Sequence, residues 1–351
     1  MKILLADNHI TGHHAPYLSA LVNGLKQNFD VVLLVPEDSF HLGVRTYCCD
    51  EYVHSIRGSI SWLKRVCSVA QKEKVDIVHL LTGDDFYRFF GIGFWRLKEY
   101  KTVVTFHNAK QGALFQCSYR SIFRQIDRGI CHTEFIEELL HGYGIHNCTH
   151  IEYPQLNDQD FPSREAARKA LQIDGKAPVL AALGEARFSK GLDLLLKALQ
   201  SVQHPFQLLI AGREGAFSNQ YVEELTRSYS SQVTMLRRFL TEQELQNCIA
   251  AADYVVLPYR LDFYGASGPL AEAVWAGRPV ISAGHGSLGD IVKKHHLGYT
   301  FASEDVQDLA KVIDQALASK FLFDDAAEAY RRRRDAGTFC SRYQEVYRSL
   351  I

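Results

Sequence analysis

The sequence predicts an α/β protein built from two doubly wound, Rossmann-like domains. Short apolar runs alternate with amphipathic helices along the whole chain, as in parallel sheets covered by helices on both faces. A polar stretch over 152–178 interrupts this alternation, and 351 residues suit two domains of roughly 150 residues each. We therefore expect domains over 1–160 and 161–335 that face each other across a cleft, with a C-terminal helix over 336–351 packing back on the first.

Five apolar runs predict the strands of the first domain: 2–6, 31–35, 76–81, 102–106 and 129–131. Between the first two runs, apolar residues recur at helical spacing. This spacing predicts a helix whose buried face carries Tyr17, Leu18, Leu21, Val22 and Leu25.

Six further runs predict the strands of the second domain: 179–183, 207–211, 234–236, 254–257, 279–282 and 299–301. Ser163 begins a short helix, and Thr241 with Glu244 forms a capping box that opens another. A helix over 269–276 should end at Gly277, because glycine is the favoured residue just beyond a helix end.

Composition disfavours several function classes. Lys and Arg number 39 against 40 Asp and Glu, so no overall basic field exists to attract nucleic acid. No run of about 18 apolar residues predicts a membrane span, and the first eight residues are too short and polar for a signal peptide. The expected location is the cytoplasm, with contact at the inner face of the membrane as an open alternative.

The turn after the first strand does not favour a bound cofactor. Residues 7–14 contain one glycine, Gly12, instead of a Gly-x-Gly-x-x-Gly motif, and no P-loop sequence occurs in the chain. The adjacent His13 and His14 point in different directions at a helix start, which disfavours a shared metal ion. We predict no metal and no cofactor, and we place these two histidines at the acceptor side of the cleft.

His107 follows the predicted strand 102–106 directly. Open parallel sheets bind ligands at the carboxyl ends of their strands, so this imidazole could donate to a substrate hydroxyl or balance a developing charge. A purely structural histidine is an equally compatible interpretation.

The strongest local signal is Gly-Glu-Ala-Arg-Phe-Ser-Lys-Gly over 184–191, between strand 179–183 and the next helix. Arg187 supplies a planar fork and Lys190 a point charge, while the helix start supplies free N–H groups. Together they suit a cluster of anionic oxygens, although a solvated turn has a similar composition.

A second signal follows strand 254–257. Small residues around Ser267 and Gly268 would let a ligand approach the backbone, and a helix starting near Pro269 would direct its N-terminus at that ligand. We expect Glu272 in the first turn of this helix, where it could chelate sugar hydroxyls or simply complement the helix dipole.

Together these segments resemble the retaining glycosyltransferases of family 4, which have the GT-B fold. Residues 184–191 resemble the family's glycine–Arg–Lys–glycine element, 246–258 its helix, Ala-Asp and strand, and 264–282 its signature helix and following strand. The context of His107 resembles a strand-terminal histidine beside the donor sugar. The resemblance is strong over 179–302 and faint but collinear elsewhere.

The resemblance implies residue roles. Arg187 and Lys190 would hold the diphosphate of a nucleotide sugar, and Glu272 would contact its ribose. Tyr264 stands where the family signature has a glutamate that touches the donor sugar. The predicted catalytic residues are His107, Arg187 and Lys190; the donor-binding residues are Gly184, Tyr264, Ser267, Gly268, Pro269, Glu272 and, in the loop after strand 234–236, Arg238; and the acceptor or cleft residues are Gly12, His13 and His14.

The expected function is transfer of a hexose from a UDP- or GDP-sugar to a hydroxyl of a saccharide or lipid-linked saccharide, with retention and without a metal ion. A nucleotide-sugar epimerase of the same fold and a two-lobed binding protein without catalysis remain open alternatives. The segment 86–98 mixes aromatic and cationic residues, as interfacial helices do, but a core helix against the first sheet fits it as well.

Overall fold

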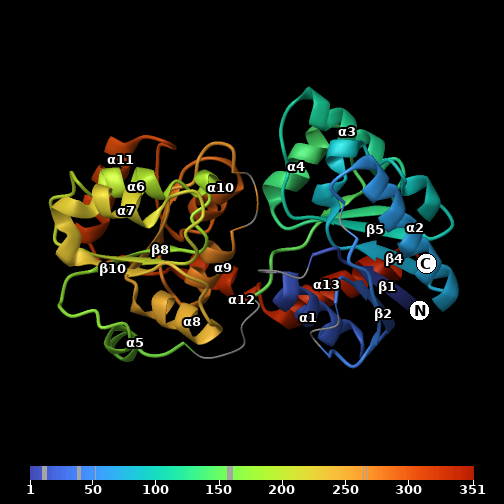
Figure 1. Ribbon diagram of the computed structural model, residues 1–351, viewed down its shortest axis with the longest axis horizontal. Coiled ribbons are helices and arrows are strands. Elements are labelled where there is room, and N and C mark those ends of the chain that lie inside the picture. The colour runs from blue at the N-terminus through green and yellow to red at the C-terminus, as the bar shows by residue number, and fades with distance from the viewer. Residues whose placement is uncertain (10–13, 38–40, 52, 156–160, 264, 266) are drawn as a thin grey trace. The chain divides into compact units, whose positions relative to one another are not determined.

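The computed structural model describes residues 1–9, 14–37, 41–51, 53–155, 161–263, 265 and 267–351 (Figure 1). The chain divides into two compact units: Met1–Asn157 with Arg333–Ile351, and Asp158–Arg332. Each unit contains one parallel sheet with helices packed against it. The predicted fold class is therefore confirmed.

The sheet of the first unit has the strand order β3-β2-β1-β4-β5-β6-β7, and its pairings are parallel. β2 and β3 lie on one side of β1, and β4 to β7 lie on the other side of β1. The carboxyl ends of β1 and β4 therefore form a topological switch point, where such sheets bind ligands. The strands are β1 (Lys2–Ala6), β2 (Asp30–Val35), β3 (Arg45–Cys48), β4 (Ile77–Leu80), β5 (Lys101–Phe106), β6 (Arg128–Cys131) and β7 (Cys148–His150).

All five predicted strands of this unit are present, but β3 and β7 had no signal in the sequence. Both are edge strands of three or four residues that are only partly buried. An edge strand needs no continuous apolar run, because one of its sides lacks a neighbouring strand.

The helices of the first unit are α1 (His14–Leu25), α2 (Ile56–Glu73), α3 (Ala113–Phe123), α4 (Glu134–Gly142) and α13 (Ala336–Ser349). Three 3₁₀ helices follow β4: η1 (Gly83–Asp85), η2 (Tyr87–Phe89) and η3 (Phe94–Leu97). The buried face predicted for α1 is confirmed. The segment 86–98 forms short turns instead of one interfacial helix, and its Phe86, Phe94 and Leu97 are buried in the core.

The sheet of the second unit has the order β10-β9-β8-β11-β12-β13, again with parallel pairings. Its switch point lies between β8 and β11, so a ligand is expected at the carboxyl ends of these two strands. The strands are β8 (Val179–Leu183), β9 (Gln207–Ala211), β10 (Val233–Leu236), β11 (Tyr254–Leu257), β12 (Val280–Ala283) and β13 (Gly298–Phe301), all six of which the sequence predicted to within one residue.

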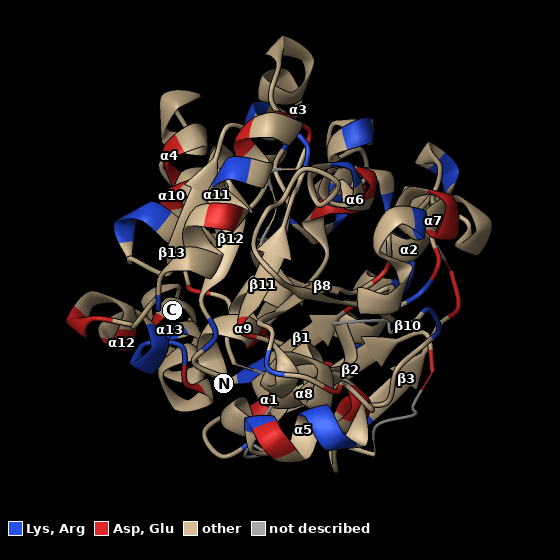
Figure 2. Cartoon of the chain, turned by 90° about the vertical axis from the view of Figure 1, so that its left-hand side faces the viewer, with Lys and Arg blue, Asp and Glu red and all other residues tan. Residues whose placement is uncertain are grey.

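The helices of this unit are α5 (Arg164–Ala170), η4 (Phe188–Lys190), α6 (Leu192–Ala198), α7 (Asn219–Thr226), η5 (Arg227–Gln232), α8 (Glu242–Ala251), α9 (Gly268–Trp275), α10 (Gly286–Lys294), α11 (Val306–Ala318) and α12 (Asp325–Arg332). Ser163 caps α5, and the capping box at the start of α8 is confirmed. Both α5 and α12 carry residues of both signs, as Figure 2 shows, and in α12 the acids lie in the first turn and the arginines in the last. Of the helices that the structure describes, none is long and apolar enough to cross a bilayer.

A buried polar network joins α13 to the first sheet. His79 of β4 contacts the Tyr347 hydroxyl through Nδ1 at 2.6 Å and the Thr105 hydroxyl through Nε2 at 2.8 Å. The hydroxyl of Tyr343 hydrogen-bonds that of Tyr17 on α1. Burial, with a smaller contribution from the charge of His132, lowers the pKa of His79 to about 3. The imidazole therefore stays neutral, and its two nitrogens need one donor and one acceptor.

We expect Tyr347→Phe to lower the free energy of unfolding of the first unit by about 1–3 kcal/mol, because it leaves a buried imidazole nitrogen unsatisfied. Tyr299→Phe is the matched control, since it removes the same atom from an exposed bond to Ser319 of 2.9 Å and should cost less than about 0.5 kcal/mol. Denaturant unfolding followed by fluorescence measures both values. Equal losses would show that the α13 network does not stabilise the unit.

Candidate active site

The loops after β8 and β9 pack backbone against backbone at the carboxyl edge of the second sheet. The Gly184 amide donates to the Ala211 carbonyl at 2.8 Å, and the Ala186 amide donates to the Arg213 carbonyl at 3.0 Å. A Cβ placed on Gly212, whose φ is +130°, would lie 2.3 Å from the Gly184 oxygen. Only glycine permits this approach, so the two loops form one rigid rim.

Lys190 lies on this rim at the end of η4. A Cβ on Gly184 would lie 2.7 Å from the Lys190 Nζ, so the absent side chain makes room for the ammonium group. Burial, and then the charge of Arg187, lower the pKa of Lys190 to about 8. In the part of the chain that the structure describes, neither cation forms an ion pair. Two positive charges are thus held together without a neutralising carboxylate.

Arg260 holds the η4 turn in place. Its guanidinium bonds both carboxylate oxygens of Asp193, at 3.0 and 2.9 Å, and its Cζ lies 3.9 Å from the ring centre of Phe188. Its backbone amide donates to the Ser189 carbonyl at 2.8 Å. This fork-to-carboxylate geometry fixes the turn that carries Arg187 and Lys190.

The start of α9 adjoins the same rim. Ser267 caps the helix by accepting from the Leu270 amide at 3.2 Å, and its hydroxyl contacts the Tyr259 hydroxyl at 3.1 Å. The Tyr259 ring centre is 6.0 Å from the Lys190 Nζ. A Cβ on Gly184 would also lie 3.9 Å from Pro269 Cγ. The structure thus brings Gly184, Lys190 and the N-terminus of α9, with Ser267, Gly268 and Pro269, to one place.

Glu272 does not lie in the first turn of its helix, so that prediction is wrong. Because Ser267 is the cap, α9 begins at Gly268 and Glu272 is its fifth residue. The carboxylate is half-buried, and its charge counteracts part of the lowering of the Lys190 pKa. It therefore lies near the cation pair instead of complementing the helix dipole.

Arg237 lies beside this rim, although the sequence prediction chose its neighbour Arg238 from the same loop. It lines a cavity of about 30 Å³, room for about one water molecule, together with Gly184, Lys190, Gly212 and Tyr259. Its Nε donates to Asn219 at 2.6 Å and its Nη2 donates to the Phe217 carbonyl. Burial lowers its pKa. Its position directly after β10, at the carboxyl edge, was the available signal.

Arg238, the residue predicted in its place, points elsewhere. Its guanidinium is half-exposed and bonds both oxygens of Glu244, at 2.9 and 2.6 Å, at the start of α8. The structure thus ties this side chain to the capping box and does not place it on the rim with Lys190.

Beside the switch point of the first sheet, His107 directly follows β5, the strand next to β4, and is 6% exposed. Its Nε2 donates to the Leu81 carbonyl at 2.9 Å, so Nδ1 is the basic nitrogen of the neutral ring. Its ring centre lies 5.6 Å from that of His14, which contacts the Asp7 carboxylate at 3.1 Å. Burial raises the pKa of the adjacent Asp84 to about 7, although that carboxyl accepts from the His107 amide.

Three predicted site residues, Gly12, His13 and Tyr264, lie outside the described residues. Among the residues that are described, no group of three or more His, Cys, Asp or Glu side chains could hold a metal ion. In the second unit, the described residues instead bring together Arg187, Lys190 and the N-terminus of α9. In the first unit, histidine and aspartate side chains lie together at the carboxyl edge of the sheet. The former suits a diphosphate, since both groups favour anionic oxygens.

Known proteins share this architecture. The solved sucrose-phosphate synthase from Thermosynechococcus elongatus superposes with a TM-score of 0.81 at 17% identity, covering 100% of this chain and 99% of that one. Anabaena HepE, solved in complex with UDP, gives a TM-score of 0.75 at 16% identity, covering 99% and 100%.

Comparison of the amino-acid sequence with known proteins identifies relatives and a matching family. Glycogen synthase of Thermodesulfovibrio yellowstonii is 25% identical over 236 residues, which are 66% of this chain and 45% of that protein. The chain spans less than half the length of the curated relatives it matches. Residues 163–336, which contain the whole rim around Lys190, match the family described as Glycosyl transferases group 1. The chain therefore belongs, through these residues, to the glycosyl transferases group 1 family, and it has the GT-B fold.

Proposed function

We propose that this protein transfers a hexose from a UDP- or GDP-sugar to a hydroxyl of a saccharide or lipid-linked saccharide. The observation that carries the proposal is the pair Arg187 and Lys190, held on a glycine rim beside the N-terminus of α9 without a carboxylate partner among the described residues. A diphosphate supplies the missing negative charge. The UDP in the solved structure of HepE shows that a protein of this fold takes such a ligand.

The proposed chemistry moves charge onto the diphosphate. The bond between the anomeric carbon and the β-phosphate oxygen breaks, and its electron pair stays on the nucleoside diphosphate. The acceptor oxygen forms the new bond to that carbon, and its proton passes to an oxygen of the leaving diphosphate. Arg187, Lys190 and the amides at the start of α9 stabilise the developing charge, which is why we propose a metal-independent reaction. Retention of configuration rests on the resemblance to family 4.

The other predicted residues receive proposed roles that follow their positions. Glu272, near the cation pair, contacts the donor ribose, and Ser267 with Gly268 contacts the diphosphate or sugar. His107, which lies beside the switch point of the first sheet, serves the transferred sugar, while His14 serves the acceptor. The roles proposed for Gly12, His13, Tyr264 and Arg238 rest on the sequence alone.

A panel of nucleotide sugars separates the proposal from its alternatives. A transferase releases nucleoside diphosphate in an acceptor-dependent manner, an epimerase changes the sugar without releasing it, and a binding protein does neither. A thermal-shift screen with UDP, GDP and ADP identifies the base, because a ligand that binds only the folded state raises its apparent stability. Stabilisation by none of the three would contradict the proposal.

We expect Arg187→Ala and Lys190→Ala each to lower kcat/KM on the order of 10²–10³-fold, because each removes a charge that faces the leaving group. Lys197→Ala is the matched control. This lysine is exposed on α6, 3.5 Å from Asp193, and its loss should leave kcat/KM within about twofold. Steady-state assays of nucleoside diphosphate release test the three variants. Near-normal turnover in the first two would remove the basis of the assignment.

We expect nucleoside diphosphate affinity to fall as pH rises above about 8. The pKa of Lys190 in the free protein is about 8, below the ordinary 10.5, so the ammonium is charged below pH 8 and loses its proton above it. A bound diphosphate favours the charged form, which gives at most about a tenfold loss per pH unit. Calorimetric titration from pH 7 to pH 10 measures this slope.

Lys190→Arg is the control for that slope, because a guanidinium stays protonated throughout the range. The variant should bind with a nearly flat pH dependence. A slope that persists in Lys190→Arg would assign the titration to another group.

A further inference from the structure

The exposed side of α2 carries a continuous stripe of basic and small polar residues. The helix buries Trp62, Leu63, Val66 and Val69 against the first sheet. Its opposite side presents residues that, apart from the adjacent Lys64 and Arg65, follow one another at steps of three or four, the spacing that places side chains on one face of a helix. They are Arg57, Ser61, Lys64, Arg65, Ser68 and Lys72, and all six are exposed.

The 3₁₀ helix η3 packs beside this stripe and extends it. Ser59 donates to the Ile92 carbonyl at 2.9 Å, and the Cys67 thiol contacts the Arg96 carbonyl at 3.2 Å. A Cβ on Gly93 would lie 2.8 Å from Leu63. These contacts place Trp95, Arg96 and Lys98 alongside α2. We call the set of Arg57, Lys64, Arg65, Lys72, Trp95, Arg96 and Lys98 the basic face.

The charges of the basic face are not neutralised within the protein. Among the described residues, Arg57, Lys64, Arg65, Arg96 and Lys98 form no ion pair. The acid of α2, Glu73, is buried and bonded to Lys2 and Arg45 at the far end of the helix. Glu99 follows Lys98 in the sequence. Six cations are thus concentrated here in a chain whose net charge is −1.

Trp95 gives the basic face an apolar component. Its side chain is 51% exposed, although the neighbouring Phe94 and Leu97 are fully buried. Ile56, at the start of α2, is likewise 47% exposed. A tryptophan surrounded by cations is typical of side chains that lie at the boundary between lipid headgroups and acyl chains.

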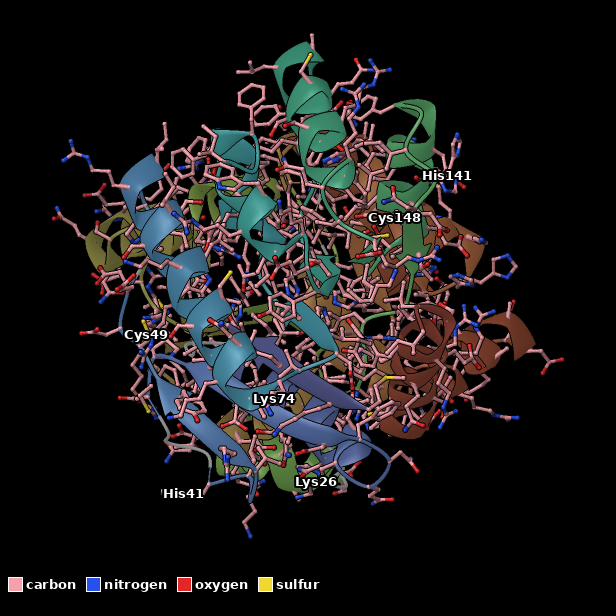
Figure 3. All side chains as sticks on the ribbon, turned by 90° about the vertical axis from the view of Figure 1, so that its right-hand side faces the viewer. Lys26, His41, Cys49, Lys74, His141 and Cys148 are labelled. Carbon is pink, nitrogen blue, oxygen red and sulfur yellow. The ribbon has the colours of Figure 1, made fainter. Side chains whose placement is uncertain are left out.

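We infer that the basic face binds the surface of an anionic lipid bilayer. The stripe from Arg57 to Lys72 extends about 22 Å along a straight helix, so its cations can contact several headgroup phosphates at once. Trp95 enters the headgroup layer beside them. Figure 3 shows α2 running along one side of the first unit to Lys74 at its end. This inference concerns a surface outside both candidate substrate sites and does not depend on the sugar-transfer proposal.

The test is co-sedimentation of the full chain with vesicles. We expect binding at about 0.1 M salt to vesicles of equal parts phosphatidylglycerol and phosphatidylcholine, and none to phosphatidylcholine alone. The double variant Lys64→Gln and Arg65→Gln should weaken binding roughly 30-fold, since each cation contributes about a fivefold attraction to such a surface. Trp95→Ala should abolish the part of the binding that survives about 1 M salt, where charges are screened.

Lys311→Gln with Lys320→Gln is the matched control, because it removes two exposed lysines at α11 of the other unit and should leave binding unchanged. Circular dichroism and UDP or GDP binding show that each variant is folded. The inference is overturned if the wild-type chain ignores anionic vesicles, if the control pair loses as much binding as the α2 pair, or if a free polyanion such as single-stranded DNA binds equally well and Trp95→Ala changes nothing.

Discussion

The second unit is organised around an ammonium group that lies over a glycine α carbon. Lys190 occupies the space that a side chain on Gly184 would fill, and burial beside Arg187 makes its charge costly to hold. Neither cation forms an ion pair with a carboxylate among the described residues. The fold therefore holds the two charges in place with rigid loops and does not neutralise them. Two glycine-rich loops, a bidentate Arg260–Asp193 pair and the capped start of α9 all converge on this rim. The proposed diphosphate would offset the electrostatic cost of holding these two charges together.

A site of this kind binds an anionic ligand more tightly but lowers the stability of the ligand-free protein. A positive charge that is largely removed from water, as on Lys190, weakens the fold until it meets a counter-charge, which is the usual compromise at binding sites. Arg237 extends the principle, because burial lowers its pKa while backbone carbonyls hold its fork. The first unit shows a different arrangement: the His14 ring contacts the Asp7 carboxylate and the His107 backbone amide donates to Asp84, so carboxyl groups lie beside the histidines at this edge.

Sequence periodicity predicted the central strands and the capped helices, because their burial and end signals are local. It did not reveal β3 and β7, whose residues are strands only because a neighbouring strand pairs with them. Arg187 and Lys190 were recognisable from glycine spacing, whereas the choice between Arg237 and Arg238 depends on which side chain the end of β10 turns inward. The helix that carries Glu272 begins at Gly268, one residue earlier than predicted, because Ser267 caps it, and this shift moves Glu272 out of the first turn. Of the basic face, the sequence indicated only the segment 86–98, which contains η3; the contribution of α2 was not recognised, because the two parts are separated in the sequence.

The first unit is completed by α13, which follows the second unit in the sequence, and this order affects folding during synthesis. Tyr343 and Tyr347 reach Tyr17 and His79 across more than 260 positions of the chain. During translation the whole of the second unit, Asp158–Arg332, is synthesised before the first unit is complete. Until α13 leaves the ribosome, Tyr17 and His79 lack the hydroxyls of Tyr343 and Tyr347, and the nascent first unit exposes the surface of α1 that α13 later covers. The part that emerges first is therefore the part that finishes folding last.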